Sequence, residues 1–442
     1  MNKVAIVGFG RFGKTLYRLL KDDFEIVLFN RSNNAYKNFP LNSKTRIVHA
    51  VKEIYDAEVI FYAVPIASFE SVIKSHKKYF KKHLLIDVLS VKMHASGVFK
   101  KHLKGTNARA LLTHPMFGPD SSKNGFNGLR IVMDRFSANK KEYTEWKNYF
   151  SKKGLRVIEM SAKEHDRLAA FSQGLAHFMG RLLSEINFKE TTIDTTGAKK
   201  LFEIMQQTTN DTWQLFLDLQ RYNPYTKGMR LELGDAYDTL YNELLPKRID
   251  PKKVIFGIQG GTGSFNEEAL LDYVARHKIK NYEIKYLYTS EKVLRSLHEG
   301  TVDYGQFAIH NSIGGLVGES AYALSKYKVK IVEEFAIIIR HFLMKRKDVK
   351  VRDLKTIMAH PQVFAQCKTT LSKKYRKWKL FSGAGDLVDT AKAAKALQAG
   401  SISKNTAILG PINLSKLYDF DVIDKNLQDN KKNFTSFFMV SR

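Results

Sequence analysis

The stretch Lys3–Leu16, KVAIVGFGRFGKTL, decides how the first half of the chain is interpreted. It opens with a short apolar, β-branched run of buried-strand type, and a helix-like segment closes it. Between them stand Gly8, Gly10 and Gly13 at G-x-G-x-x-G spacing. In such a unit the first glycine allows a tight turn, the second lets backbone approach a pyrophosphate, and the third lets the helix pack on the strand. The helix N-terminus then offers N–H groups to the phosphates.

The same glycines also fit a second pattern, because residues 8–15 match the P-loop spacing G-x4-G-K-T. The next strand candidate, residues 25–29, helps to decide between a dinucleotide and a triphosphate as the ligand. It ends at Asn30, Arg31 and Ser32, about 20 residues after the glycines, where a dinucleotide fold meets the adenosine ribose. This position has no acidic residue for the 2′-hydroxyl of NAD, whereas arginine with serine suits a 2′-phosphate. We therefore expect NADP, with NAD possible, bound by the three glycines and these three residues; a triphosphate is the alternative.

Composition indicates a globular chain of several domains. Its 442 residues allow roughly two to four domains with ample core. No segment approaches the ~20 consecutive apolar residues of a membrane helix, and the N-terminus has no signal-peptide pattern. Cys367 is the single cysteine, which excludes an intrachain disulfide. We expect a cytoplasmic protein without a membrane partner.

The strong positive charge could indicate nucleic-acid binding. The net charge is +28, from 72 lysines and arginines against 44 aspartates and glutamates. However, the basic residues are spread along the chain, and no nucleic-acid module motif is present. We expect a lysine-rich solvated surface that draws anionic substrates into clefts, and no nucleic-acid partner.

The order of strand and helix signals predicts three regions. Further strand candidates in the first half are residues 59–64, 84–88, 129–133 and 155–160. Because helical segments lie between strands, we expect a parallel, doubly wound sheet. Residues 163–245 show only helical periodicity, which predicts an all-α domain. Residues 246–251, PKRIDP, resemble a linker, and an α/β pattern restarts after them.

Three further motifs carry a resemblance to a known family. They are DVLSVK at 87–92, HPMFGPD at 114–120 and EHDR at 164–167, all after the glycine motif. Together they resemble the prephenate/arogenate dehydrogenases of tyrosine biosynthesis, over residues 1–248. The resemblance implies a Rossmann-type NADP-binding domain at 1–162 and a helical substrate domain at 163–248, through which the protein would form a homodimer.

The resemblance also implies roles for single residues. In the family reaction, hydride leaves the hydroxyl-bearing carbon of prephenate for the nicotinamide, carbon dioxide departs and the ring becomes aromatic, without a metal. His114 would take the hydroxyl proton, Ser90 would lie beside it and the nicotinamide, and His177 would help form the substrate pocket. The family arginine that clamps a substrate carboxylate is replaced by Gln214, and Arg221 lies on the same helix face. This replacement leaves arogenate open as the substrate, and we favour prephenate.

A second resemblance covers residues 253–442. Its motifs are GGTGSF at 260–265, NSIGG at 311–315, HPQ at 360–362, DTA at 389–391 and NFTSF at 433–437. In this order they resemble the catalytic domain of prephenate dehydratases, whose fold has two α/β lobes like a periplasmic binding protein. We expect lobe 1 at 253–335 plus 421–442 and lobe 2 at 336–420, within an α/β multidomain protein.

The dehydratase resemblance implies a second set of site residues. Dehydration of prephenate removes the ring hydroxyl, a poor leaving group that needs a proton or hydrogen-bond donor. Thr435 would be that donor. Thr262, Asn311, Ser312 and Thr390 would hold the substrate carboxylates, together with N–H groups of the glycine-rich turn.

Two positions depart from the dehydratase pattern. His310 stands where the family has a glutamate, and Ser436 stands where it has an arginine. Two readings follow. The chain is either a bifunctional prephenate dehydrogenase and dehydratase, which we favour, or a dehydrogenase whose second half is a non-catalytic ligand-sensing module.

Overall fold

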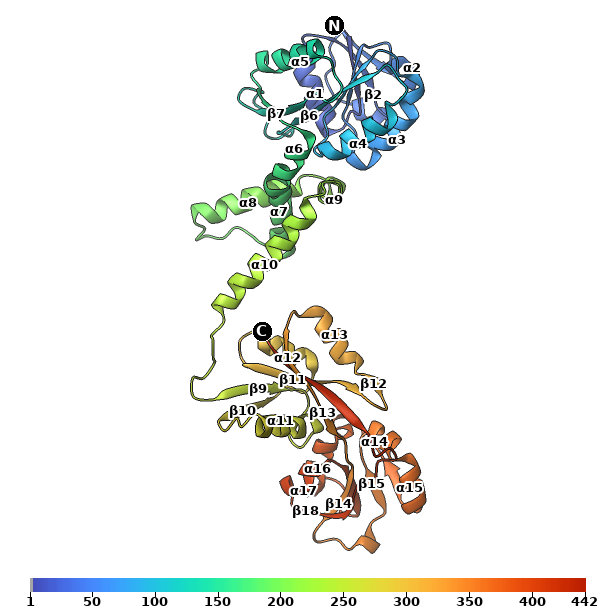
Figure 1. Ribbon diagram of the computed structural model, residues 1–442, viewed down its shortest axis with the longest axis vertical. Helices are drawn as coiled ribbons and strands as arrows, with labels where there is room; N and C mark the ends of the chain where they lie inside the picture. The colour runs from blue at the N-terminus through green and yellow to red at the C-terminus, as the bar shows by residue number, and fades with distance from the viewer. Residues whose placement is uncertain (1–2) are drawn as a thin grey trace. The chain divides into compact units, whose positions relative to one another are not determined.

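The computed structural model describes residues 3–442, apart from the side chains of Asn33 and Asp386. The chain divides into two compact units, Met1–Tyr237 and Asp238–Arg442. In Figure 1 the first unit runs from blue to yellow-green and the second from yellow to red. Each unit has its own sheets and its own cores, and each is described by itself.

The first unit contains one eight-stranded sheet with the order β3-β2-β1-β4-β5-β6-β7-β8. Its strands are β1 Lys3–Val7, β2 Glu25–Phe29, β3 Thr45–Val48, β4 Val59–Tyr62, β5 Leu84–Asp87, β6 Arg109–Pro115, β7 Arg130–Asp134 and β8 Arg156–Glu159. All neighbouring strands are parallel except β6 and β7, which are antiparallel. The predicted Rossmann-type sheet is thus confirmed. The strand candidates did not include β3 or β6; β6 opens with Arg-Ala-Leu-Leu, residues that favour helices.

Helices cover both faces of this sheet (Figure 1). They are α1 Arg11–Leu20, α2 Val51–Ile54, α3 Ile66–His76, α4 Lys92–His102 and α5 Lys140–Lys152. One core joins α1 and α5 to the sheet and includes Leu16 and Trp146. A second core joins α3 and α4 to the opposite face, with Phe69 and Phe99. This arrangement is the doubly wound fold, in which ligands bind at the carboxyl ends of the strands.

A helical region follows β8. It consists of α6 Ala162–Ala169, a π-helical turn Ala170–Gly174, α7 Leu175–Glu185, α8 Thr196–Thr209, α9 Trp213–Tyr222 and α10 Thr226–Leu244. Helices α7 and α8 pack closely at Gly180, where a Cβ atom would lie 1.9 Å from Oγ1 of Thr208. Between residues 163 and 244 the structure contains only helices and connecting turns, as the periodicity predicted.

The second unit contains two sheets. The first has the order β10-β9-β11-β19-β13, with β12 paired to β11, and the second has the order β16-β15-β17-β14-β18. The strands are β9 Val254–Ile258, β10 Tyr282–Tyr286, β11 Tyr304–Asn311, β12 Gly315–Leu316, β13 Lys330–Ile338, β14 Phe342–Arg346, β15 Thr356–Met358, β16 Lys379–Phe381, β17 Thr406–Gly410, β18 Phe420–Asp424 and β19 Phe434–Ser441. Strand β19 lies between β11 and β13. The predicted two-lobed α/β fold is confirmed.

Helices again flank both sheets of this unit. In the first lobe they are α11 Phe265–Arg276, α12 Ser290–His298 and α13 Gly318–Lys326; in the second they are α14 Pro361–Gln366, α15 Lys368–Lys374, α16 Thr390–Gln398 and α17 Asn413–Leu417. Residues 421–424, which we expected in the first lobe, lie in the second. They belong to β18, which pairs antiparallel with β14 through Met344 opposite Val422.

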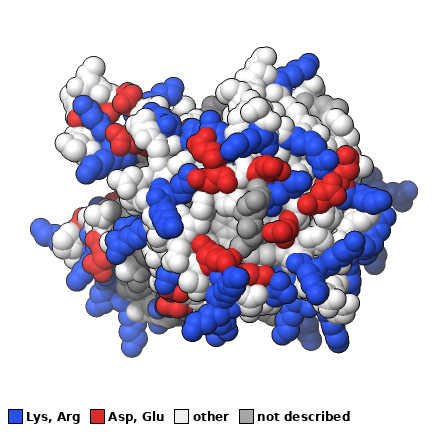
Figure 2. All heavy atoms as spheres, turned by 90° about the horizontal axis from the view of Figure 1, so that it is seen from above, with Lys and Arg blue, Asp and Glu red and all other residues white. Residues whose placement is uncertain are grey.

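The charged surface is mixed in sign. On the face shown in Figure 2, lysine and arginine side chains outnumber aspartate and glutamate side chains, and the acidic side chains lie among them. Among residues 3–442, no helix is both long and apolar enough to cross a bilayer.

Candidate active sites

The turn after β1 is shaped by its glycines. Gly8 has a φ of +96°, and a Cβ there would lie 2.3 Å from the carbonyl oxygen of Ala63. A Cβ on Gly13 would lie 2.1 Å from the carbonyl oxygen of Gly8, so only glycine lets α1 start this close to β1. Gly10, the N-cap of α1, has no atom within 4 Å of its Cβ position. The N-terminus of α1 is therefore open to a close ligand, as pyrophosphate binding needs.

The turn after β2 is tied to the glycine turn. The side chain of Asn30 accepts a hydrogen bond from the backbone N–H of Phe9 and donates one to the carbonyl of Ser32, both at 2.9 Å. Arg31 and Ser32 are exposed at the end of β2. Asn30 thus has an orienting place in the turn, while the guanidinium of Arg31 is accessible to a ligand.

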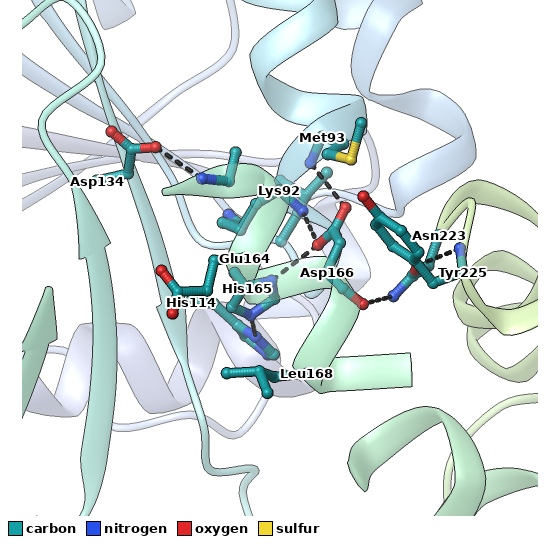
Figure 3. Close-up of polar contacts among 12 residues, drawn as sticks. Lys92, Met93, His114, Asp134, Glu164, His165, Asp166, Leu168, Asn223 and Tyr225 are labelled. Carbon is teal, nitrogen blue, oxygen red and sulfur yellow. Dashed lines mark hydrogen bonds and ion pairs between the residues drawn. The ribbon is translucent and has the colours of Figure 1, made fainter. Parts of the chain in front are cut away.

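His114 ends a buried chain of polar contacts at the carboxyl end of β6. Its Nδ1 lies 2.8 Å from Nε2 of His165, and Nδ1 of His165 lies 2.8 Å from Oδ1 of Asp166 (Figure 3). His114 is only 2% exposed. Burial, reinforced by the neighbouring side chains of His165 and Lys92, holds the pKa of His114 well below its ordinary value. The imidazole is therefore neutral at physiological pH and can accept a proton.

Asp166 also holds the start of α4. Its two carboxylate oxygens accept the backbone N–H groups of Lys92 and Met93, each at 2.8 Å (Figure 3). Its own carbonyl accepts a hydrogen bond from Nδ2 of Asn223 at 2.8 Å. The first helix of the helical region is thereby joined to a helix of the sheet and to the residue that follows α9.

The DVLSVK motif surrounds a buried ion pair. Lys92 is paired with Asp87 and also donates to the carbonyl of Thr113, the residue before His114. Burial lowers the pKa of Lys92 and raises that of Asp87, while their mutual attraction opposes both shifts. Ser90 is half-buried in the loop between them. Because β5 and β6 are parallel neighbours, Ser90 and His114 leave the same edge of the sheet.

His177 lies beside a second ionic network. It is buried on α7, with Nε2 3.9 Å from Oδ2 of Asp211, and burial lowers its pKa. Among the described residues its Nδ1 has no hydrogen-bond partner. Arg11, the first residue of α1, binds Asp211 at 2.9 Å and Asp120 of the HPMFGPD motif at 3.0 Å. One arginine of the glycine turn thus joins two sequence motifs to the helical region.

The two positions expected to clamp a substrate carboxylate, Gln214 and Arg221, both lie on α9. Nε2 of Gln214 donates to Oδ1 of Asp218 at 2.7 Å, and Oδ2 of Asp218 accepts the N–H of Ala67 at 3.1 Å. The amide of Gln214 therefore belongs to a contact between α9 and the N-terminus of α3. Arg221 is exposed at the end of α9.

Sequence reasoning missed Arg181. It follows His177 by four residues on α7, and it donates to the carbonyl of Asp211 at 2.6 Å. Its guanidinium lies 5.3 Å from the ring centre of Trp213. The spacing of four residues after His177 on one helix was the available signal. Arg181 and Arg11 place two cations next to Asp211.

The second unit contains an open cavity of about 390 Å³. Its walls come from both lobes: from β11, β19 and the glycine turn in the first, and from the starts of α14 and α16 in the second. Within the described part of the chain, its lining contains no lysine or arginine. Phe265 at the N-terminus of α11 and Thr390 at that of α16 both line it. A bound carboxylate would therefore rely on main-chain N–H groups and helix dipoles.

Asn311 and Thr435 face each other in this cavity. They are direct partners on the antiparallel strands β11 and β19, and both line the cavity. A bulge between Ala308 and His310 lets both Ala308 and Asn311 line the cavity, although an unbroken strand would turn them to opposite faces.

The amide of Asn311 has one defined orientation. Its Oδ1 accepts the N–H groups of Ile313 at 3.0 Å and Gly314 at 2.8 Å, and its Nδ2 donates to Oγ1 of Thr435 at 2.9 Å. Because Oγ1 already accepts this hydrogen bond, the hydroxyl proton of Thr435 is available to a ligand in the cavity. The amide of Asn311 orients Thr435 and is itself fully engaged.

The remaining predicted residues of this unit divide into two groups. Thr390 lines the cavity and accepts the N–H of His360 at 3.3 Å. Thr262 and Ser312 are exposed and lie outside the lining. The hydroxyl of Ser312 accepts the N–H of Phe434 at 3.0 Å, which joins the ends of β11 and β19.

The two departures from the dehydratase pattern lie away from the cavity. His310 is exposed and pairs with Ser436 across the strands. Each is the immediate neighbour of a cavity residue, Asn311 or Thr435, and successive side chains of a strand point to opposite faces. Accordingly, neither His310 nor Ser436 is among the residues that line the cavity.

His341 is a cavity residue that no motif indicated. It is 1% exposed, and its Nε2 lies 2.7 Å from Oε1 of Gln366. The same oxygen accepts Nδ2 of Asn433 at 3.0 Å, and Oδ1 of Asn433 accepts Nδ2 of Asn311 at 2.9 Å. A hydrogen-bonded chain thus runs from the second lobe to Thr435. A single histidine within an apolar segment gives no sequence signal.

Family models match three consecutive parts of the chain. Residues 23–159 match the nucleotide-binding domain of prephenate dehydrogenase, residues 182–253 match the TYRAAT1-like C-terminal domain, and residues 256–442 match prephenate dehydratase. The class of protein is therefore a fusion of a dehydrogenase-type nucleotide-binding domain with a dehydratase-type domain. The matched nucleotide-binding domain implies NAD(P), so the triphosphate alternative is set aside.

Curated relatives agree with this division. Arogenate dehydrogenase 2, chloroplastic, of Arabidopsis thaliana is 30% identical over 281 residues, which are 61% of this chain and 78% of that protein. The chain accordingly belongs to the prephenate/arogenate dehydrogenase family and carries a prephenate dehydratase domain of aromatic amino acid biosynthesis.

Other relatives are matched over a smaller share. Arogenate dehydrogenase 1, chloroplastic, of Arabidopsis thaliana is 32% identical over 55% of this chain and 39% of that protein. The bifunctional chorismate mutase/prephenate dehydratase of Buchnera aphidicola is 31% identical over 42% of this chain and 47% of that protein. A solved prephenate dehydrogenase from A. aeolicus is 16% identical, with a TM-score of 0.44 over 63% of this chain and 96% of that one.

Proposed function

We propose that this chain is a bifunctional enzyme with two sites for prephenate. The first, in residues 1–162 and 163–248, oxidises and decarboxylates prephenate to 4-hydroxyphenylpyruvate with NADP. The second, in residues 253–442, dehydrates and decarboxylates prephenate to phenylpyruvate. The observation that carries the proposal is that each unit holds an oriented proton-transfer group: neutral His114 in the first and Thr435, with a free hydroxyl proton, in the second.

In the first site His114 is the proposed general base. Nδ1 is engaged with His165, so Nε2 is the ring nitrogen that would take the ring hydroxyl proton. Ser90 leaves the same sheet edge and would bind near that hydroxyl. His177, Arg181 and Arg11 would bind the substrate carboxylates in place of the replaced family arginine. The nucleotide, held by the glycine turn, supplies the hydride acceptor.

In the second site Thr435 would donate a hydrogen bond to the departing ring hydroxyl while the ring carboxylate leaves as carbon dioxide. Thr390 and the N-termini of α11 and α16 would hold the carboxylates. A ligand-sensing role was favoured only by His310 and Ser436, and both lie outside the cavity lining. The structure therefore gives greater support to catalysis.

NADP is the proposed nucleotide because Arg31 is exposed where an acidic residue would select NAD. We expect Arg31→Ala to weaken NADP binding about 10- to 100-fold, the loss typical of a charged hydrogen bond, and to leave NAD binding unchanged. Fluorescence titration with both nucleotides measures this. Arg46→Ala, at an exposed arginine on β3 paired with Asp56, is the matched control. Equal weakening for both nucleotides would contradict the assignment.

We also propose a homodimer formed through the helical region, in the cytoplasm. Apolar side chains of this region are exposed in the single chain, among them Leu201 on α8 and Leu231 on α10. Such exposure is typical of surfaces that pair with a partner. The cytoplasmic location is proposed from the single cysteine alone.

The decisive experiment analyses products. Purified protein is incubated with prephenate, with and without NADP, and the keto acids are separated by chromatography. We expect phenylpyruvate without nucleotide, and 4-hydroxyphenylpyruvate in addition when NADP is present. Parallel reactions contain arogenate or NAD. If the hydroxylated product forms alone, the second unit is not a prephenate dehydratase; if arogenate alone reacts, the proposed substrate is wrong.

A further inference from the structure

The contacts of Asp166 fix where protons lie around His114. The carboxylate is fully buried, accepts hydrogen bonds from the backbone N–H groups of Lys92 and Met93, and lies 2.8 Å from Nδ1 of His165. It stands at the N-terminus of α4, where the helix dipole favours a negative charge. An ionised carboxylate can only accept hydrogen bonds, so Nδ1 of His165 carries a proton.

The proton on Nδ1 of His165 also determines where the proton of His114 lies. A neutral His165 protonated at Nδ1 has its lone pair on Nε2. This Nε2 lies 2.8 Å from Nδ1 of His114, which must then be the donor. Both rings are 2% exposed, which leaves water little room to take either role. The lone pair of His114 is therefore on Nε2.

We propose that His165 and Asp166 are positioning residues that hold His114 in its Nδ1–H tautomer, with Nε2 free to accept a proton. The catalytic consequence of this tautomer rests on the proposed dehydrogenase function, because only in that reaction does Nε2 of His114 meet a substrate hydroxyl. A histidine takes the tautomer set by the hydrogen bond of its other nitrogen. His114 is thus prepared as a base before substrate arrives.

The hydrogen-bonded relay of Asp166, His165 and His114 also joins the proposed base to the loop of Ser90. Asp166 accepts hydrogen bonds from the N–H groups of Lys92 and Met93. These are the second and third residues after Ser90. Lys92 in turn donates to the carbonyl of Thr113, next to His114. One carboxylate thus positions both segments that would flank the reacting hydroxyl.

The first test reads the tautomers directly and needs no activity. The whole protein is labelled with ¹⁵N-histidine and studied at alkaline pH by long-range proton–nitrogen correlation. We expect protonated Nδ1 and unprotonated Nε2 for both rings, assigned by the signals lost in His114→Asn and His165→Phe. A proton on Nε2 of His114 would overturn the proposal. The signals of His341, in the second unit, should not move and report the integrity of that unit.

The second test uses a matched pair of variants. In His165→Gln the amide oxygen can still accept from Nδ1 of His114, whereas His165→Phe keeps a ring of similar size and removes the acceptor. We expect His165→Phe to lower kcat for oxidation about 10²- to 10⁴-fold, with KM unchanged, and His165→Gln to recover most of it. Equal losses in the two variants, or a loss confined to KM, would contradict a positioning role.

A double variant tests whether Asp166 acts through His165. We expect Asp166→Asn to lower kcat in the wild-type chain and to cost less in the His165→Phe chain, where only its contacts with Lys92 and Met93 remain to be lost, because the effects of residues in one relay are not additive. An additive loss would overturn the relay. If the tautomers are as expected but neither prephenate nor arogenate is oxidised, the relay stands and the proposed function fails.

Discussion

Burial decides how His114 responds to pH. Desolvation, with His165 and Lys92 adding to it, depresses the pKa of the imidazole. The carboxylates near it, Asp87 and Asp166, are occupied by Lys92 and by N–H donors and do not reverse this direction. A depressed pKa favours the neutral ring, so the base stays competent as the pH falls until its folded pKa is reached.

We therefore expect kcat/KM for oxidation to decline only well below pH ~6.5, which is the ordinary pKa of histidine. The decline marks the pKa of the free enzyme's base. Initial rates over a pH series in constant ionic strength measure it. The melting temperature of the first unit, measured over the same pH series, is the control for unfolding in acid. An acid limb at or above pH ~6.5 would show that another group is the base.

The hydroxyl of Thr435 should be the part of that residue that matters. We expect Thr435→Val, which keeps the shape, to lower the rate of dehydration about 10²- to 10⁴-fold, and Thr435→Ser to retain most of it. Phenylpyruvate formation without nucleotide is the measurement. Oxidation should be unchanged in both variants, and His114→Asn should give the reverse pattern. Loss of both activities in one folded variant would contradict two separate sites.

At the scale of elements, the strand–turn–helix unit of β1 and α1 needs glycine for two different reasons. At Gly13 a side chain would collide with backbone, whereas at Gly10 it would meet open space. Gly13 is therefore needed for the fold, whereas Gly10 leaves room for the ligand. The motif predicts these two roles from position alone, and the surroundings of the Cβ positions agree with them.

This difference predicts opposite results for two alanine substitutions. Gly13→Ala should lower the melting temperature of the first unit, because the new Cβ would lie 2.1 Å from the carbonyl oxygen of Gly8. Gly10→Ala should leave the melting temperature unchanged and weaken NADP binding, since the methyl group would occupy the approach of the pyrophosphate. Calorimetry with and without NADP measures both. Normal nucleotide binding by Gly10→Ala would contradict the placement of the phosphates.

Motifs within one turn were predictable, and contacts between distant segments were not. The glycine turn and the strands on both sides of it follow from local pattern. By contrast, His114 meets His165 across 51 residues, and Asn311 meets Thr435 across 124. A pattern identifies the residue types at each end, but only the folded sheet brings them into contact.

Some site residues carried no signal or a misleading one. His341 follows Arg340 within an otherwise apolar segment, and no motif surrounds it. Ser312 belongs to a recognisable motif, yet its hydroxyl is used to join two strand ends. Gln214 occupies the place of a family arginine but bonds to Asp218 of its own helix. In each case the hydrogen-bond partner, which is not visible in sequence, determines the role.

At the scale of the whole molecule, the two units have separate sheets and separate cores. A ligand of one unit should therefore stabilise that unit alone. We expect calorimetry to resolve two transitions, and NADP at about 100 times its Kd to stabilise the one that contains the first unit by about 2.7 kcal/mol. The Gly13→Ala variant identifies that transition. A shift of both transitions by NADP would show that the units unfold together.

The position of β19 has a consequence for synthesis on the ribosome. Residues 434–441 lie between β11 and β13, strands that are translated more than a hundred residues and nearly a hundred residues earlier. The first unit can fold as soon as it emerges, whereas two strands of the second must wait with unpaired edges for their shared neighbour. A chain stalled before residue 434 would expose these edges and would also lack Thr435. Premature termination would thus give an aggregation-prone product with one complete unit and one incomplete unit.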